Sequence, residues 1–358
     1  MRINILSPGF YKSGGLLTIY DYSNRFVENG HEVTLYIPKK IYNLQVDKFQ
    51  PIDKLRRIVH RFRIDREKYL LELKKYKFDI KIVPSLKNRY IDDADITVAT
   101  AWPTAFDLNS YETSKGKKVY FVQDYEVWDS NIKYVDMSYK LPVNKIVISK
   151  YLQDLLRNKF NTDSEIVLTS INFQLFNNEQ KIFNENSVLL FVYSEANRKN
   201  IKMIMQSMEY IHEKYPNVVI KSFGFEKKEI IPVYIEYSEN PSLEDRIKLY
   251  CNSDIFLLSS NFEGFGIPPA EAMACRCAVV STDVGAISEY SENNVSSLIV
   301  PSGNLDKFIK AIEYLINNKK EIERISIAGY NNVREKLNYE ESVKKFENLL
   351  VKWSNDKL

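Results

Sequence analysis

Short apolar runs alternate with longer amphipathic stretches along the chain, and this alternation is typical of parallel α/β proteins. The apolar runs are rich in Val, Ile, Leu and Phe and too short for helices, so they predict strands buried on both faces. They cover residues 3–6, 31–37, 96–99, 118–122, 145–148, 187–193, 217–223, 231–235, 254–259 and 278–281. Helical periodicity is clear at about 15–29, 150–160, 200–214 and 242–252. The strand–helix order predicts two domains, each built on a parallel sheet.

The domain boundary is predicted by a break in this order. The stretch from Thr169 to Asn186 is polar and irregular, which is typical of a linker. We therefore expect an N-terminal domain at residues 1–168 and a C-terminal domain at 187–338. The last segment, 339–358, has the periodicity of an amphipathic helix that ends near Trp353.

The composition is that of a globular protein with room for two cores. The chain has 358 residues, of which 44% are hydrophobic and 27% are charged. No apolar run approaches the ~20 residues of a membrane-spanning helix. The first residues lack the apolar core of a signal peptide and predict a strand. The three cysteines, two of them in Cys275-Arg276-Cys277, suit neither a disulfide framework nor a paired metal site, so we expect packing roles in a reduced cytoplasm.

Charge is distributed unevenly along the chain. Residues 39–89 contain sixteen Lys or Arg and six Asp or Glu, a local charge of +10, while the rest of the chain carries −7. Within this segment, residues 54–77 predict a basic amphipathic helix. Two interpretations stay open: the helix lies on an anionic membrane surface, or its charges form a solvated face. Nucleic-acid binding is disfavoured because no aromatic residues alternate with these charges for base stacking.

The most specific candidate site is the stretch from Ser259 to Cys275. Its two adjacent prolines suit the first turn of a helix, where a missing N–H group costs nothing. Glu263 then lies in a strand-to-helix loop, and Glu271 lies about one turn into the helix. Gly264 and Gly266 lack a Cβ atom, so a ligand can approach the loop amides. Two carboxylates beside such amides indicate a polyhydroxylated ligand.

Other glycine-rich and basic positions lie at the starts of predicted helices. Gly14 and Gly15 open the first helix, where a phosphate or a sugar can approach the backbone. Arg198 and Lys199 lie at another predicted helix N-terminus, which suits a diphosphate. The sequence has no G-x-G-x-x-G fingerprint and no G-K-[ST] phosphate loop, which disfavours a dehydrogenase.

A polar run follows the predicted strand 118–122, where side chains of an open α/β sheet face the ligand crevice. Gln123 cannot relay a proton, so acid–base catalysis is not expected there, whereas Asp124 or Glu126 can orient an acceptor hydroxyl. The acidic run 92–95 lies at the opposite edge of its strand. We interpret it as a strand edge and not as a metal site.

The stretch from Ser259 to Cys275 closely resembles the E-x7-E signature of family-4 glycosyltransferases, a family with the GT-B fold. The resemblance follows the order of elements over nearly the whole chain and is specific from about 240 to 305. It implies two Rossmann-like domains with parallel sheets facing a central cleft and a C-terminal helix that crosses back to the N-domain. It also implies retaining transfer from a nucleoside-diphosphate sugar to an acceptor hydroxyl, in surface-polysaccharide or glycolipid assembly.

The resemblance implies a role for each matching residue of the donor site. Glu263 and the backbone of Gly264-Phe265-Gly266 would contact the donor sugar. Glu271 would hold the ribose hydroxyls, and Arg198 and Lys199 would hold the diphosphate. No metal and no other cofactor is implied.

The acceptor side is less specific. Gly14 and Gly15 would face the cleft, as the glycine loop of the family does, and would belong to the donor-binding residues. Gln123 stands where many relatives carry His, and the run from Gln123 to Glu126 is reminiscent of bacterial rhamnosyltransferases. Asp124 would act with Glu263 as a catalytic group, and Gln123 and Glu126 would contact the acceptor.

The expected protein is a cytoplasmic enzyme, and on the membrane interpretation its segment 54–77 contacts the inner face of the membrane. Its partners would be the nucleotide-sugar donor and a glycan or lipid-linked acceptor. Two other classes stay open. One is a non-catalytic GT-B subunit that binds nucleotide or another transferase, and the other is a GT-B epimerase acting on a nucleotide sugar.

Overall fold

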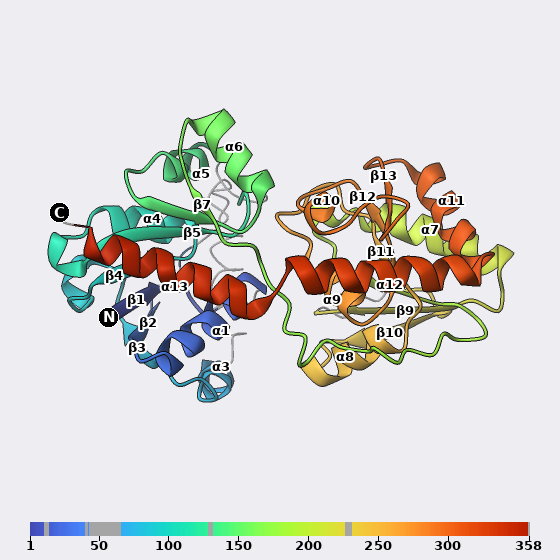
Figure 1. The fold of residues 1–358 in the computed structure, drawn as a ribbon, viewed down its shortest axis with the longest axis horizontal. Helices are drawn as coiled ribbons and strands as arrows, with labels where there is room; N and C mark the ends of the chain where they lie inside the picture. The colour runs from blue at the N-terminus through green and yellow to red at the C-terminus, as the bar shows by residue number, and fades with distance from the viewer. Residues whose placement is uncertain (11–13, 40–41, 43–65, 128–131, 226–230, 357–358) are drawn as a thin grey trace, which may run out of the picture. The chain divides into compact units, whose positions relative to one another are not determined.

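Two parallel sheets organise the chain in the computed structural model, one in each of two units (Figure 1). The structure describes residues 1–10, 14–39, 42, 66–127, 132–225 and 231–356. The first unit comprises residues 1–168 together with 340–358, and the second unit comprises residues 169–339. Each unit has its own apolar core around its sheet.

The sheet of the first unit has the strand order β3-β2-β1-β4-β5-β6-β7 among the described residues. Its strands are β1 (Arg2–Leu6), β2 (Glu32–Pro38), β3 (Asp79–Val83), β4 (Ile96–Ala99), β5 (Lys117–Val122), β6 (Asn144–Val147) and β7 (Glu165–Ile166). All neighbouring pairs are parallel. The strand order changes direction between β1 and β4, and ligands of doubly wound sheets bind at the carboxyl ends of such a pair.

The helices of the first unit begin and end where local chemistry allows. They are α1 (Gly14–Glu28), α3 (Arg66–Leu73), α4 (Trp102–Asn109), α5 (Ile132–Tyr139), α6 (Lys150–Phe160) and α13 (Tyr339–Asn355). At the start of α6, Ser149 Oγ accepts a hydrogen bond from the amide of Leu152 at 3.1 Å, which satisfies an otherwise unpaired N–H group. The same helix ends at Asn161, whose left-handed φ of 51° stops the chain from continuing as a helix.

The second unit repeats the architecture with the strand order β10-β9-β8-β11-β12-β13. Its strands are β8 (Val188–Val192), β9 (Val219–Gly224), β10 (Ile235–Glu239), β11 (Ile255–Leu258), β12 (Ala278–Thr282) and β13 (Leu298–Val300). Its helices are α7 (Ile201–Lys214), α8 (Leu243–Cys251), α9 (Ile267–Ala274), α10 (Ile287–Tyr290), α11 (Leu305–Ile316) and α12 (Lys319–Lys336). The order changes direction between β8 and β11, so the loops that follow these two strands are neighbours.

The core of the second unit lies between the sheet and its helices. Phe191 of β8 and Leu257 of β11 pack with Met208 of α7 and Phe308 of α11, and all four are at most 1% exposed. Burial on both faces explains why these strands have continuous apolar sequences. The predicted α/β class with two parallel sheets is thus confirmed.

One predicted strand was wrong, and three strands were missed. The run 231–235 predicts a strand, but β10 begins only at Ile235, after a turn in which the amide of Ile235 donates to the carbonyl of Pro232 at 3.0 Å. Val233 is fully exposed, so the apolar run there marks no core. The missed strands are β3, β7 and β13. β3 is an exposed edge strand with a lysine at its centre, and the other two have only two or three residues.

The basic segment 54–77 is described only from residue 66 onward, where α3 runs to Leu73. Residues 54–65 lie outside the described residues, so the predicted amphipathic helix stays a prediction. Among the described residues, no helix combines the length and the apolar character needed to cross a bilayer.

Helix α13 belongs to the first unit through an aromatic cluster. Phe346 is fully buried and its ring lies 5.0 Å from Phe121 of β5, 5.6 Å from Phe26 and 5.8 Å from Tyr22 of α1, measured between centroids. Glu347, next to it, accepts a hydrogen bond from the Nδ2 of Asn29 at 2.7 Å. The C-terminal helix is therefore an integral part of the core that the N-terminal residues build.

We expect Phe346→Ala to destabilise the first unit by about 3–5 kcal/mol, because it removes a large buried ring and leaves a cavity. Urea unfolding followed by far-UV circular dichroism measures the change. Val351→Ala, at an exposed position of the same helix, is the matched control and should shift stability by no more than about 0.5 kcal/mol. Equal stability of the two variants would contradict the packing role of Phe346.

Candidate functional site

The loop between β11 and α9 carries the strongest candidate residues. Glu263 lies in this loop and is only 5% exposed. Gly266 precedes α9 with a left-handed φ of 87°, which a side chain would strain. The helix then begins at Ile267 with Pro268 in its first turn, so Glu271 lies one turn into α9, as the sequence predicts.

Glu263 is the centre of a charged cluster. Its Oε1 lies 2.5 Å from the Nζ of Lys199 and 2.6 Å from the Oγ of Ser260, which donates a hydrogen bond to it. Its Oε2 lies 3.6 Å from the Nη1 of Arg198. The two cations come from the short turn Asn197–Lys199 that follows β8. Three residues predicted from separate parts of the sequence thus meet at the carboxyl ends of β8 and β11.

Backbone contacts hold these two loops together. The amide of Asn261 donates to the carbonyl of Arg198 at 2.7 Å, and the Oγ of Ser259 donates to the carbonyl of Lys199 at 3.1 Å. Gly285, in the loop after β12, supports the other side with a φ of 58°. A Cβ atom there would lie 2.6 Å from the carbonyl oxygen of Glu263. The position of Glu263 therefore depends on three loops of one sheet edge.

The amides of Glu263, Gly264, Phe265 and Gly266 donate no hydrogen bond to any partner in the part of the chain that the structure describes. All four residues are buried. Buried amides in proteins nearly always have a hydrogen-bond partner, so four consecutive amides without one indicate a binding surface for ligand oxygens. Phe265 itself stacks on Tyr290, with ring centroids 5.1 Å apart, and this contact fixes the loop.

Glu271 is the second buried carboxylate and has its own partners on α8. The hydroxyl of Tyr250 donates to its Oε2 at 2.9 Å, and the Nη2 of Arg246 lies 3.6 Å from its Oε1. Burial raises the pKa of Glu271, while Arg246 and Tyr250 act in the opposite direction. The buried Nε of Arg246 has no hydrogen-bond partner among the described residues, so this guanidinium can also donate to a ligand.

Sequence reasoning missed Arg246, Tyr250 and Ser260. Arg246 and Tyr250 are four residues apart and so share a face of α8. That spacing, in a helix leading to the candidate loop, is the signal that could have found them. Ser260 lies three residues before Glu263, within reach of its carboxylate.

The first unit places the predicted acceptor-side residues, and the predicted donor-binding Gly15, near the end of β5. A Cβ atom on Gly15 would lie 2.7 Å from the Oε1 of Gln123, so the start of α1 touches the residue that follows β5. Gly14 is the first residue of α1 and is exposed. Asp124 accepts a hydrogen bond from the amide of Tyr125 through its Oδ1 at 2.8 Å.

Glu126 is engaged by its own unit. Its Oε1 accepts hydrogen bonds at 3.2 Å from the amide of Trp102, the first residue of α4, and from the hydroxyl of Tyr120. Burial raises the pKa of Glu126 to about 8, and the negative charge of Asp124 adds to the shift. The carboxyl group therefore caps a helix, a role that the sequence did not reveal.

The acidic run 92–95 is divided among separate partners. Asp92 pairs with Lys81, Asp93 pairs with Lys115 at 2.8 Å, and Asp95 accepts a hydrogen bond from the amide of Arg2 at 2.7 Å. Across the described ranges, no group of three or more His, Cys, Asp or Glu is arranged to hold a metal ion. These aspartates act as anchors at a strand edge.

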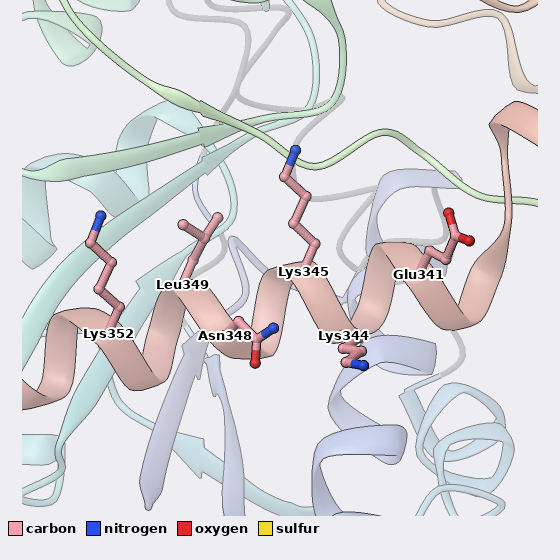
Figure 2. A pocket seen from close by; sticks show the side chains of 6 residues that line it. All are labelled: Glu341, Lys344, Lys345, Asn348, Leu349 and Lys352. Atoms are coloured by element: carbon pink, nitrogen blue, oxygen red, sulfur yellow. The ribbon is translucent and has the colours of Figure 1, made fainter.

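Two hollows of the first unit lie away from the predicted residues. One, of about 330 Å³, is lined by α13 alone, and Figure 2 shows Lys345 and Lys352 extending from one side of this helix. The other, of about 610 Å³, lies at the amino ends of β5 and β6. Lys118 and Lys145 line the second hollow, but both donate to backbone carbonyls. Neither hollow is lined by any of the predicted site residues, so we do not place the site in them.

Comparison with known protein families finds a match within the second unit. Residues 172–332 match the sequence model of the family described as glycosyl transferases group 1. The capsular polysaccharide biosynthesis glycosyltransferase CapM of Staphylococcus aureus is 29% identical over 202 residues, which cover 52% of this chain and 53% of CapM. A probable sucrose-phosphate synthase of Thermosipho melanesiensis is 27% identical over 169 residues, which cover 43% of this chain and 39% of that protein. The chain thus spans about half the length or less of these curated relatives.

Solved structures resemble the whole chain at low sequence identity. HepE of Anabaena in complex with UDP-glucose has a TM-score of 0.76 at 12% identity, over 98% of this chain and all of that one. Sucrose-phosphate synthase of Thermosynechococcus elongatus has a TM-score of 0.74 at 14% identity, over 98% of both chains. These comparisons establish the fold, which is GT-B with two Rossmann-like domains.

We expect the stability of the first unit to fall as pH rises from about 5 to about 9. In the folded chain Glu126 keeps a proton that the unfolded chain releases from its ordinary pKa of 4.5 upward, so folding becomes less favourable until about pH 8. The side chain at this position in the Glu126→Gln variant is neutral at every pH. The free energy of unfolding of this variant should therefore fall by a few kcal/mol less than that of the parent chain over the same pH range. Urea unfolding at both pH values measures it.

The control for this measurement is Glu112→Gln, a change at an exposed position of the same unit. This variant should keep the pH dependence of the parent chain. If Glu126→Gln and Glu112→Gln gave the same slope of stability against pH, the raised pKa of Glu126 would be refuted.

Proposed function

We propose that the chain is a glycosyltransferase that moves a sugar from a nucleoside-diphosphate sugar to an acceptor hydroxyl. The observation that carries the proposal is the site at the carboxyl edge of the second sheet. There, the loop after β11 and the helix that follows it carry two buried carboxylates and four consecutive amides with no partner among the described residues, and two cations pair with Glu263. Such a set matches a ligand that has many hydroxyl groups and a charged diphosphate.

The diphosphate fits the charge balance of the Glu263 cluster. Lys199 and Arg198 together carry two positive charges, and the carboxylate of Glu263 neutralises one of them. A diphosphate bound beside these cations would satisfy the remaining charge. Departure of the nucleoside diphosphate leaves extra negative charge on the phosphate, which preorganised cations stabilise in the transition state.

Glu271 fits a sugar diol such as the ribose of a nucleotide. A carboxylate accepts two hydrogen bonds from neighbouring hydroxyls, and Glu271 already has Tyr250 and Arg246 on one side to orient it. Burial raises the pKa of Glu271 and so disfavours its charged form, although Arg246 and Tyr250 act in the opposite direction. Hydroxyl donors from the ligand would further stabilise the charged form.

The amides of residues 263–266 fit the oxygens of the transferred sugar. They precede α9, and helix N-termini favour partly negative oxygen atoms. We propose that Glu263 positions this sugar and that transfer retains the anomeric configuration, with attack on the face that the diphosphate leaves. The family-4 assignment and the retaining course rest on the resemblance of the Ser259–Cys275 stretch.

The acceptor is proposed to be a glycan or a lipid-linked glycan of a surface polysaccharide. CapM is named for capsular polysaccharide biosynthesis, and HepE was crystallised with UDP-glucose, which supports a uridine diphosphate sugar as the first donor to test. Gln123 and Asp124 are the proposed acceptor-side groups, and Asp124 would orient the attacking hydroxyl.

We expect Glu271→Ala to weaken donor binding about 10- to 100-fold, because it removes charged hydrogen bonds to ligand hydroxyls. Glu263→Ala should lower kcat about 100-fold or more, with a smaller effect on donor affinity. Isothermal titration calorimetry with nucleotide sugars measures affinity, and initial rates of sugar transfer measure kcat.

Glu244→Ala is the matched control, since Glu244 is an exposed glutamate on α8 that pairs with the exposed Lys248. It should leave both quantities unchanged. Transfer at the parental rate by Glu263→Ala would refute the role of Glu263. A folded chain that binds none of the nucleotide sugars tested would refute the proposed function, and altered free sugar released without an acceptor would indicate an epimerase.

The proposed membrane contact of residues 54–77 has a separate test. We expect the chain to float with vesicles of anionic lipid at low salt and to be released at high salt, because basic residues near the surface contribute about 1 kcal/mol each. Vesicles of neutral lipid are the control. Absence of salt-sensitive binding would leave these charges as a solvated face.

A further inference from the structure

The hollow of about 610 Å³ in the first unit is lined by residues at or just before the amino ends of β5, β6 and β7. Its volume is within the range of sites that bind small molecules. Gln123 and Asp124 follow the other end of β5, so the hollow and the proposed acceptor-side groups lie at opposite edges of one sheet. A ligand of this hollow is therefore separate from the sugar-transfer reaction.

Two lysines reach the hollow from the same face of the sheet. β5 and β6 are parallel, and Tyr120 of β5 lies opposite Lys145 of β6. Side chains directly opposite each other share a face, and alternate residues of a strand do so as well. Lys118 is two residues before Tyr120, so it shares the face of Lys145. Both lysines line the hollow.

The two ammonium groups donate to backbone carbonyls of the neighbouring helix ends. The Nζ of Lys118 donates to two carbonyls at the end of α4, at 2.6 and 2.9 Å. The Nζ of Lys145 donates to two carbonyls in the segment after α5, at 2.7 and 3.0 Å. An ammonium group has three N–H donors, so one donor of each lysine stays available to a ligand.

These carbonyls do not neutralise the charge of the lysines. Within the part of the chain that the structure describes, neither Lys118 nor Lys145 forms an ion pair with a carboxylate. Lys145 is only 4% exposed, and lysines are almost never buried to that degree without a partner of opposite charge. Burial lowers the pKa of Lys145 to about 8 and also lowers the pKa of Lys118. The charged form of each lysine therefore lacks stabilisation.

The charge balance around the hollow is positive. Lys117 also lines it and has no hydrogen bond or ion pair with any described residue. Asp163 is the carboxylate among the lining residues, but it is exposed and lies 3.6 Å from Arg157. The ends of α4 and α5 each contribute about half a negative charge. Three lysines therefore leave a surplus of about one positive charge.

We propose that this hollow binds the phosphate group of a small phosphorylated molecule, such as a sugar phosphate. A phosphate monoester carries up to two negative charges and three acceptor oxygens, so it matches the remaining donors of Lys118 and Lys145 in charge and in number. The side-chain amide of Asn144 also lines the hollow and has no hydrogen-bond partner among the described residues, so it can donate to the ligand as well. The rest of the volume accommodates the uncharged part of the molecule.

Isothermal titration calorimetry of the full chain at pH 7.5 and low salt tests this site, with ribose 5-phosphate as the probe. We expect one bound molecule per chain, and affinity about 10-fold weaker or more in Lys118→Met and in Lys145→Met, because each change removes a charged hydrogen bond. Lys87→Met changes an exposed lysine of the same unit and should keep the parental affinity. Ribose, which carries no charge, should not bind.

Two outcomes of this experiment would overturn the proposal. One is a folded chain that binds neither ribose 5-phosphate nor inorganic phosphate. The other is affinity that is lost in Lys199→Met and kept in Lys118→Met, because the anion would then bind beside Glu263. If Lys118→Met and Lys145→Met do not fold, Lys117→Met takes their place, because Lys117 contributes no hydrogen bond to the described fold. This variant should weaken binding about 3-fold or more through the lost charge, and parental affinity in it would contradict the site.

The pH dependence of binding distinguishes a ligand contact of Lys145 from a purely structural role. The charged side chains that line the hollow are Lys117, Lys118, Lys145 and Asp163. A phosphate monoester has its second pKa at about 6, so ribose 5-phosphate keeps its charge above pH 7.5. Lys145 loses its proton as the pH rises through about 8. Affinity should therefore fall about 10-fold between pH 7.5 and pH 9.5 in the parent chain and less in Lys145→Met. The same pH profile in both chains would refute the contact.

Discussion

Burial of two carboxylates at one sheet edge is the constraint on which the second unit depends. An ionised carboxylate away from water is costly unless a cation and hydrogen-bond donors meet it. Glu263 is met by Lys199 and Ser260, and Glu271 is met by Tyr250 and Arg246. The side chains in the turn after β8 and on one face of α8 are therefore determined by the need to pair with Glu263 in its loop and with Glu271 on α9. Removing Glu263 would leave the neighbouring cations Arg198 and Lys199 to repel each other. Removing Glu271 would take away the carboxylate with which Arg246 pairs.

The strand order explains why these partners can meet. The second sheet changes direction between β8 and β11, so the loop carrying Arg198 and the loop carrying Glu263 leave adjacent strands on the same edge. Gly285 lies in the loop that follows the next strand, β12. Because it has no side chain, this loop can pack closely against the carbonyl of Glu263. The chemistry of the site is thus a consequence of topology as much as of residue type.

Much of the fold and of this site was predictable from the sequence, and the failures have physical causes. Strands buried on both faces, such as β1 and β11, have apolar runs that stand out, whereas β3 at an exposed edge does not. The prediction of a strand at 231–235 was wrong because the apolar run there includes a residue that is exposed to solvent. Arg246 escaped notice because its partner Glu271 is distant in sequence, and the contact exists only after folding.

Both units contain buried donors without a hydrogen-bond partner among the described residues, such as Trp102 Nε1 in the first unit and Arg246 Nε in the second. In the first unit, Glu126 accepts hydrogen bonds from the amide of Trp102, at the N-terminus of α4, and from the hydroxyl of Tyr120. Its carboxyl group therefore has a structural role. The second unit leaves donors without partners among the described residues, in the amides of 263–266 and in Arg246. Unsatisfied buried donors are tolerated only where a ligand or water satisfies them. The amides of residues 263–266 form a run of four such donors in one loop, whereas Glu126 is already engaged within its own unit.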